Sequence, residues 1–164
     1  MNNKFDKFII LIYLGLIAWL GYRLFKSNKS KKNLEGQIKS FGKKTTTMEY
    51  ILFGLLVLTG AVNLYQGINT KNQTALITAS VMIVMGFVFF LNTKTKIYIA
   101  ENGILLNDSF FTYKQLKKWG FDKERGNLVI LTKKDHQESQ ESTQVKKEDI
   151  NEINSLIRKY KLGK

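Results

Sequence analysis

The residues best suited to chemistry are seven lysines within one short segment of the chain. Residues 26–47 contain these lysines and a single acidic residue, Glu35. Ammonium groups at this density attract phosphate and carboxylate anions, and each one near an anionic lipid surface contributes about 1 kcal/mol. We therefore expect contacts with anionic lipid headgroups from Lys26, Lys29, Lys31, Lys32, Lys39, Lys43 and Lys44.

Residues suited to catalysis or metal binding are few. The chain has no cysteine and one histidine, His136, which excludes thiolate sites and histidine clusters. His136 lies in a polar stretch, 135–143, that has the composition of a solvated loop. Four acids, Glu101, Asp108, Asp122 and Glu124, have no spacing that assigns a general acid and a general base. We expect no enzymatic activity, no cofactor and no bound metal.

Three apolar runs dominate the first 91 residues. They cover residues 8–25, 50–68 and 75–91, and the only charge within them is Arg23. A helix of 18 residues rises about 27 Å, close to the thickness of a bilayer's hydrocarbon core. The sequence therefore predicts three transmembrane helices. The first could instead be a secretory signal, but no small-residue cleavage pattern follows it, which favours an uncleaved anchor.

The distribution of lysines predicts how these helices are oriented. The seven lysines lie between the first and second runs, whereas the loop between the second and third holds only Lys71. Cytoplasmic loops are enriched in Lys and Arg. We expect a multi-pass protein of the cell membrane with its N-terminus outside and its C-terminal domain in the cytoplasm. The net charge of +13 then reports mainly on topology.

The lysine-rich segment itself has two readings. Leu34, Ile38 and Phe41 recur at helical spacing, which suits a short amphipathic helix in the headgroup plane. The alternative is a flexible tether whose lysines only fix topology. No nucleic-acid partner is expected, because the segment lies between two spans and has one aromatic residue.

The last third of the chain changes to short alternating elements. Strand-like stretches occur at 96–100, 104–106, 110–113 and 128–131, and Asn102-Gly103 is typical of a hairpin turn with positive φ. Leu116 and Trp119 are candidate core residues, and a short strand is expected near 144–145. A C-terminal helix is predicted from one apolar face, formed by Ile150, Ile153, Leu156, Ile157 and Tyr160.

Three stretches carry a resemblance to a known family. They are YIAENGI at 98–104, YKQLKKW at 113–119 and DINEINSLI at 149–157. This order resembles the bacterial pleckstrin-homology-like domains of small Gram-positive membrane proteins, over about 70 residues. The resemblance implies an antiparallel sheet capped by a helix, a binding or scaffold role and no catalytic residues. The family pattern has seven strands, of which five or six can be placed here, so an open or truncated sheet is an alternative.

These observations give one architecture and three functional hypotheses. The fold class is an α-helical membrane half followed by a small α+β domain. The predicted segments are helix 1 at 1–25, a basic cytoplasmic linker at 26–47, a transmembrane hairpin at 48–91 and a pleckstrin-homology-like domain at 92–164. The first hypothesis is a non-enzymatic membrane protein whose cytosolic module binds a protein partner or the inner leaflet. The alternatives are an accessory or immunity protein in membrane stress or bacteriocin defence, and a small transporter or enzyme subunit.

Overall fold

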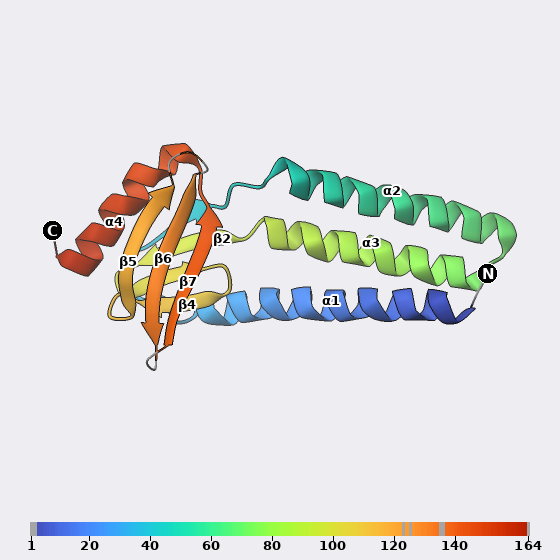
Figure 1. Ribbon diagram of the computed structural model, residues 1–164, viewed down its shortest axis with the longest axis horizontal. Coiled ribbons are helices and arrows are strands. Elements are labelled where there is room, and N and C mark those ends of the chain that lie inside the picture. Colours follow the sequence, from blue (N-terminus) through green and yellow to red (C-terminus); the bar gives the residue numbers. More distant parts are fainter. Residues whose placement is uncertain (1–2, 123, 125, 135–136, 164) are drawn as a thin grey trace. The chain divides into compact units, whose positions relative to one another are not determined.

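The computed structural model describes residues 3–122, 124, 126–134 and 137–163 (Figure 1). Chain contacts divide it into two compact units. One unit comprises Met1–Leu24 and Thr45–Thr93, and the other comprises Phe25–Lys44 and Lys94–Lys164. Each unit is therefore built from two separated pieces of the chain.

The first unit is helical. Its elements are α1 (Asn3–Lys31), whose last turns belong to the second unit, α2 (Thr47–Thr70) and α3 (Gln73–Thr93). All three are long and apolar enough to cross a membrane, which confirms the predicted helices. They are longer than the apolar runs because polar residues complete their terminal turns. At the start of α2, for example, the Thr46 hydroxyl accepts from the Glu49 N–H at 3.2 Å.

Helices α2 and α3 form a tightly packed hairpin. Lys71 takes a left-handed conformation (φ 49°) and ends α2. Gly67 permits the closest approach, because a Cβ there would lie 2.9 Å from the Leu76 side chain. Asn63 donates from Nδ2 to the sulfur of Met82 at 3.6 Å, so the polar side chain of α2 serves helix packing.

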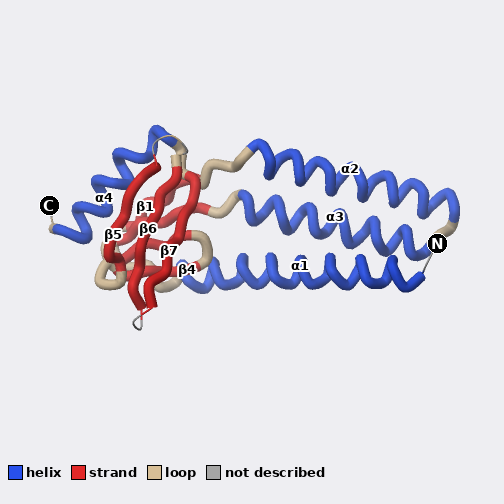
Figure 2. The backbone as a smooth tube through the Cα atoms, viewed as in Figure 1, coloured by secondary structure: helices blue, strands red, loops and turns tan. Residues whose placement is uncertain are grey.

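The second unit contains two antiparallel sheets and a helix (Figure 2). The four-stranded sheet has the order β1-β2-β3-β4, and the three-stranded sheet has the order β5-β6-β7. The strands are β1 (Ile38–Gly42), β2 (Lys96–Ala100), β3 (Gly103–Leu106), β4 (Ser109–Thr112), β5 (Leu116–Asp122), β6 (Asn127–Lys134) and β7 (Gln137–Gln144). A short 3-10 turn, η1 (Lys147–Asp149), leads into α4 (Ile150–Leu162). The predicted antiparallel sheet with a C-terminal helix is confirmed.

The lysine-rich segment contains a strand, so the expected interfacial helix is wrong. Ile38–Gly42 pairs with Lys96–Ala100 along its whole length. Of the supposed apolar stripe only Phe41 enters the core, whereas Ile38 is 51% exposed. Backbone pairing with β2 and burial of one aromatic ring outweigh the local helical spacing. The tether reading also fails for this stretch, since residues 25–44 belong to the sheet unit.

The polar stretch after β6 is also a strand. Gln137–Gln144 pairs with Asn127–Lys134 over eight residues, where a loop was expected. Five of its eight residues are exposed and only Thr143 is buried, because β7 is the last strand of its sheet. Polar residues are usual on such edges, where they discourage further pairing. Asp135 and His136 lie outside the described residues.

The hairpin between β2 and β3 forms as predicted, but for a different reason. Neither Asn102 nor Gly103 has a positive φ. The Asn102 side chain instead accepts from the Glu35 N–H at 3.1 Å and donates to the Asn33 carbonyl at 2.8 Å. Gly103 is needed for space, because a Cβ there would lie 2.4 Å from the carbonyl oxygen of Phe111.

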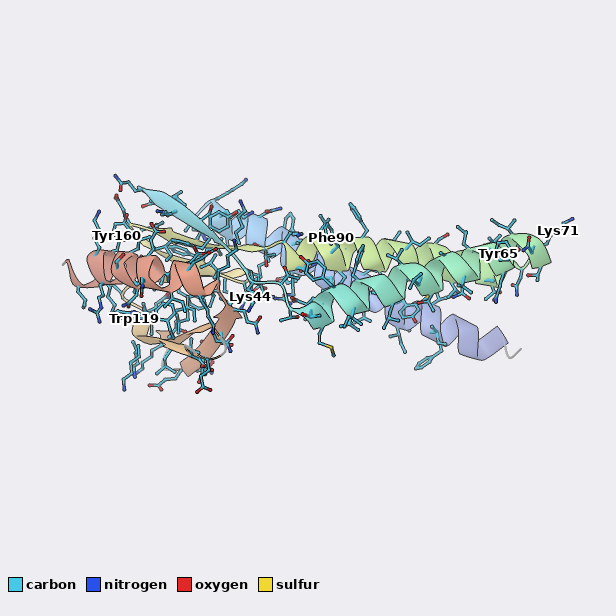
Figure 3. The ribbon with its side chains drawn as sticks, turned by 90° about the horizontal axis from the view of Figure 1, so that it is seen from above. Lys44, Tyr65, Lys71, Phe90, Trp119 and Tyr160 are labelled. Atoms are coloured by element: carbon cyan, nitrogen blue, oxygen red, sulfur yellow. The ribbon has the colours of Figure 1, made fainter. Side chains whose placement is uncertain are left out.

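One hydrophobic core holds the sheet unit together. Fully buried side chains come from both sheets and from α4, including Ile99, Leu128, Ile130, Ile153 and Ile157. Their positions on α4 match the predicted apolar face. Trp119 lies partly buried against this core, as does Tyr160 (Figure 3).

The burial of β1 gives a direct stability test. Phe41→Ala removes a side chain that is 4% exposed, and should cost about 3–5 kcal/mol of unfolding free energy. Ile38→Ala on the same strand should change it by less than about 0.5 kcal/mol, because that side chain already contacts solvent. Urea unfolding of the purified full chain, followed by Trp fluorescence, measures both. A loss of unfolding free energy for Phe41→Ala as small as that expected for Ile38→Ala would show that Phe41 is not a core residue.

Candidate anion-binding site

Pairing of β1 with β2 brings together lysines from two distant parts of the chain. Gly42 is the last residue of β1 and pairs with Lys96, the first residue of β2. The residues that follow Gly42 and those that precede Lys96 therefore leave the sheet at the same end. Lys44, Lys94 and Lys96 are exposed there, and Lys43 is half-buried. We call these four lysines the basic junction.

The backbone of the junction is fixed by the second sheet. Lys43 forms an isolated antiparallel bridge with Val145, and the Lys44 N–H donates to the Gln144 carbonyl at 3.1 Å. Val145 is fully buried and donates to the Gly126 carbonyl at 2.8 Å. These bonds join the end of β1 to the end of β7. The backbone of Lys44 is therefore tied by a hydrogen bond to the end of β7.

The lysines at the end of α1 mostly hold that helix against the first sheet. The Lys26 ammonium lies 3.4 Å from the Asp108 carboxylate and 3.3 Å from the Ser109 hydroxyl. Ser30 adds a hydrogen bond to the Asp108 carbonyl at 3.1 Å. Lys31 lies 5.2 Å above the Tyr98 ring, a cation–π contact. Lys26 and Lys31 thus already have partners within the domain.

Of the remaining predicted lysines outside the junction, one is paired within the domain and two are exposed. Lys39 forms an ion pair with Glu152 of α4. Lys29 and Lys32 are exposed at the end of α1. The structure therefore separates the seven predicted lysines rather than gathering them on one surface. Lys94 and Lys96 complete the junction, and sequence reasoning missed them as site residues because the pairing of β1 with β2 is not visible in local spacing.

The acids considered for catalysis have structural roles in the turns. The Asp108 carboxylate forms an ion pair with the Lys26 ammonium. The Asp122 carboxylate accepts a hydrogen bond from the Glu124 N–H at 3.0 Å. Glu101 lies in the turn between β2 and β3. Within residues 3–122, 124, 126–134 and 137–163, no group of three or more His, Asp or Glu side chains is arranged to hold a metal ion.

The partly buried hydroxyl of Tyr113 also has a structural role. Burial, with a smaller effect from Tyr160, raises the pKa of the Tyr113 hydroxyl. That hydroxyl donates to the Ala100 carbonyl at 2.8 Å. Because its pKa rises from an already high value, Tyr113 stays protonated at neutral pH and keeps this hydrogen bond. This hydrogen bond joins β2 to the chain segment that follows β4.

Taken together, the fold and site define a chain with three apolar helices of membrane-spanning length and an antiparallel domain that carries a basic junction. Residues 95–162 match a family described as Domain of unknown function (DUF5673). The match runs from just before β2 to the end of α4, so it leaves out β1 and the three apolar helices α1, α2 and α3. It identifies no pleckstrin-homology-like family. No curated protein matches the chain.

Proposed function

We propose that this chain is a non-enzymatic, multi-pass protein of the bacterial cell membrane whose sheet domain binds anionic headgroups of the inner leaflet. The basic junction is the observation that carries the proposal. Lys43 and Lys44 come just before α2 begins at Thr47, and Lys94 directly follows α3, which ends at Thr93. Four ammonium groups thus occupy the chain segments that enter and leave an apolar hairpin.

The chemistry of the junction suits lipid phosphates. Each lysine near an anionic leaflet contributes about 1 kcal/mol, and long basic side chains at helix ends reach into the headgroup layer. The exposed Lys44, Lys94 and Lys96 are close in the chain to the helix ends, as such contacts require. The same lysines favour a cytoplasmic location for the domain, with the N-terminus outside.

The strand count supports a pleckstrin-homology-like relationship. The described part of the chain has seven strands in sheets of four and three, followed by a helix, as that resemblance implies. Strands β1 and β7 are the ones that were not predicted from sequence, and the α2–α3 hairpin interrupts the domain between β1 and β2. Domains of this kind bind ligands or scaffold other proteins, so a protein partner is part of the same proposal.

Cysteine labelling tests the proposed topology, and the chain has no native cysteine to interfere. Ser40→Cys on β1 and Ser139→Cys on β7 should react with a membrane-impermeant maleimide only after the cells are opened. Thr70→Cys, at the end of α2, should react on intact cells. All three positions are exposed, so each reports access to its side of the membrane. External labelling at 40 and 139 would reverse the topology.

Lipid retention tests the junction. We expect the full chain purified in neutral detergent to retain phosphatidylglycerol over phosphatidylcholine, as counted by native mass spectrometry. Combining Lys44→Glu, Lys94→Glu and Lys96→Glu should weaken phosphatidylglycerol binding at least tenfold, since each lysine contributes about 1 kcal/mol.

A charge-matched variant supplies the control. Lys114→Glu, Lys133→Glu and Lys159→Glu change the net charge by the same amount at exposed positions elsewhere in the domain. This variant should keep most of the lipid binding. If both variants lose binding equally, the junction is not a site and the effect is one of total charge.

A further inference from the structure

A polar pocket lies at the closed end of the α2–α3 hairpin. It has a volume of about 490 Å³, and sites for small ligands usually measure roughly 300–1,000 Å³. Its α2 residues recur at i, i+3 and i+7, so they share one face of that helix. The pocket is lined by Asn63, Gln66 and Thr70 of α2, by Asn72 of the turn, and by Thr74, Ala75 and Thr78 of α3. We call it the hairpin pocket.

The walls of the hairpin pocket are fixed by the turn that joins the two helices. Gly67 lets α2 approach α3 closely beside Leu76, and the Gly67 carbonyl accepts from the Asn72 N–H at 3.0 Å. The Asn72 Oδ1 atom in turn accepts from the N–H groups of Thr74 and Ala75 at 3.0 and 3.3 Å. These contacts set the last turn of α2 against the first turn of α3. The pocket is therefore preformed.

The hairpin pocket presents both acceptors and donors of hydrogen bonds. The hydroxyls of Thr70 and Thr78 donate to the carbonyls of Gln66 and Thr74 at 2.7 and 2.9 Å, so the two hydroxyl oxygens remain as acceptors. Within the described part of the chain, the side chains of Gln66 and Thr74 make no hydrogen bond, and the Asn63 Oδ1 atom accepts none. A hydroxyl group donates and accepts, so a ligand with several hydroxyls suits this lining.

The hairpin pocket is also electrically neutral. None of the seven described residues that line it is charged. Lys71 is next in the chain, but it lies at the tip of the hairpin and does not line the pocket (Figure 3). Helix N-termini can attract anions, yet two of the first N–H groups of α3 are already bonded to Asn72. An ionic ligand would lose hydration here without gaining a counter-charge, which favours a neutral one.

The pocket lies at the level where lipid headgroups meet the acyl chains. Helix α2 has 24 residues and is about 36 Å long, whereas the hydrocarbon core of a bilayer is about 30 Å thick. Asn63, the deepest lining residue of α2, lies only about 10 Å from the end of that helix. Tyr65 at the same level is 70% exposed, as is usual for tyrosines at a membrane surface (Figure 3).

We propose that the hairpin pocket binds a neutral, polyhydroxylated group, which is the glycosyl unit of a membrane glycolipid or of a free oligosaccharide. Ligand hydroxyls donate to the threonine oxygens and accept from the Gln66 amide, while the Ala75 methyl group contacts the C–H face of the sugar. The proposal goes beyond binding of anionic headgroups, since no residue of this pocket belongs to the basic junction. Only the side of the membrane on which the glycosyl group is bound rests on the topology proposed above.

Glycolipid retention tests this proposal. The full chain is purified in a polyoxyethylene detergent, which carries no sugar, and offered a diglycosyl diacylglycerol or the same diacylglycerol without its sugar. We expect native mass spectrometry to count at least tenfold more of the glycolipid on the protein. A free disaccharide at millimolar concentration distinguishes the two sources. If it displaces the glycolipid, the sugar alone is the ligand, and if it does not, the ligand is a sugar attached to lipid.

Substitutions locate the site. Gln66→Leu with Thr78→Val removes one amide and one hydroxyl from the lining, and should weaken glycolipid binding at least tenfold. Gln73→Leu with Ser80→Ala is the matched control, because it removes the same groups from exposed positions of α3 outside the pocket. This control should bind as the unchanged chain does. Ala75→Leu fills the pocket and should also weaken binding, and the melting temperature of each variant shows that the hairpin is still folded.

Three results would overturn the proposal. These are equal retention of the two diacylglycerols, equal loss of binding in the pocket variant and its control, and loss of phosphatidylglycerol instead of glycolipid in the pocket variant. The proposal of a basic junction fails separately, because reversing Lys44, Lys94 and Lys96 leaves every residue of the pocket unchanged and should not alter glycolipid retention. External labelling at positions 40 and 139 would move the pocket to the inner leaflet without changing what it binds.

Discussion

The pairing of β1 with β2 is the interaction on which the rest of the structure depends. It joins residues 38–42 to residues 96–100 across an interruption of 53 residues. Closing a flexible loop of that length costs about 3–4 kcal/mol. Two features offset this cost. Burial of Phe41 contributes to the core, and the α2–α3 hairpin reduces the flexible part to a few residues on each side.

This constraint also arranges the charges of the domain. Because β1 and β2 end together, lysines that are about fifty residues apart in sequence share one end of the sheet. Val145 holds that end against the other sheet, so the basic junction has an ordered backbone. The ion pair between Lys26 and Asp108 has a different role, since it fastens the last turns of α1 to the domain. Some lysines of the 26–47 segment thus make structural contacts within the domain, and others are exposed to solvent.

Elements specified by residues close together in the chain could be predicted from the sequence, whereas elements specified by pairing with distant residues could not. The apolar helices depend on length and composition alone, and α4 depends on a local 3.6-residue period, so both could be predicted. β1 could not, because Leu34, Ile38 and Phe41 fit a helix locally and the strand's partner lies beyond the hairpin. β7 was missed because an exposed edge strand needs no apolar residues, only a neighbour to pair with. Lys94 and Lys96 became site residues only through the β1–β2 register.

The most direct test of the account is a disulfide across β1 and β2. Ser40 and Tyr98 are paired in the antiparallel register, so their side chains lie on the same face at a separation that a disulfide can bridge. In the otherwise cysteine-free chain, Ser40→Cys with Tyr98→Cys should form a disulfide readily when isolated native membranes are treated with an added thiol oxidant, which takes up the two electrons. Ser40→Cys with Thr112→Cys, three strands away, should not. Mass spectrometry after proteolysis distinguishes the two. Equal yields, or no bond between positions 40 and 98, would contradict the insertion of the hairpin between paired strands.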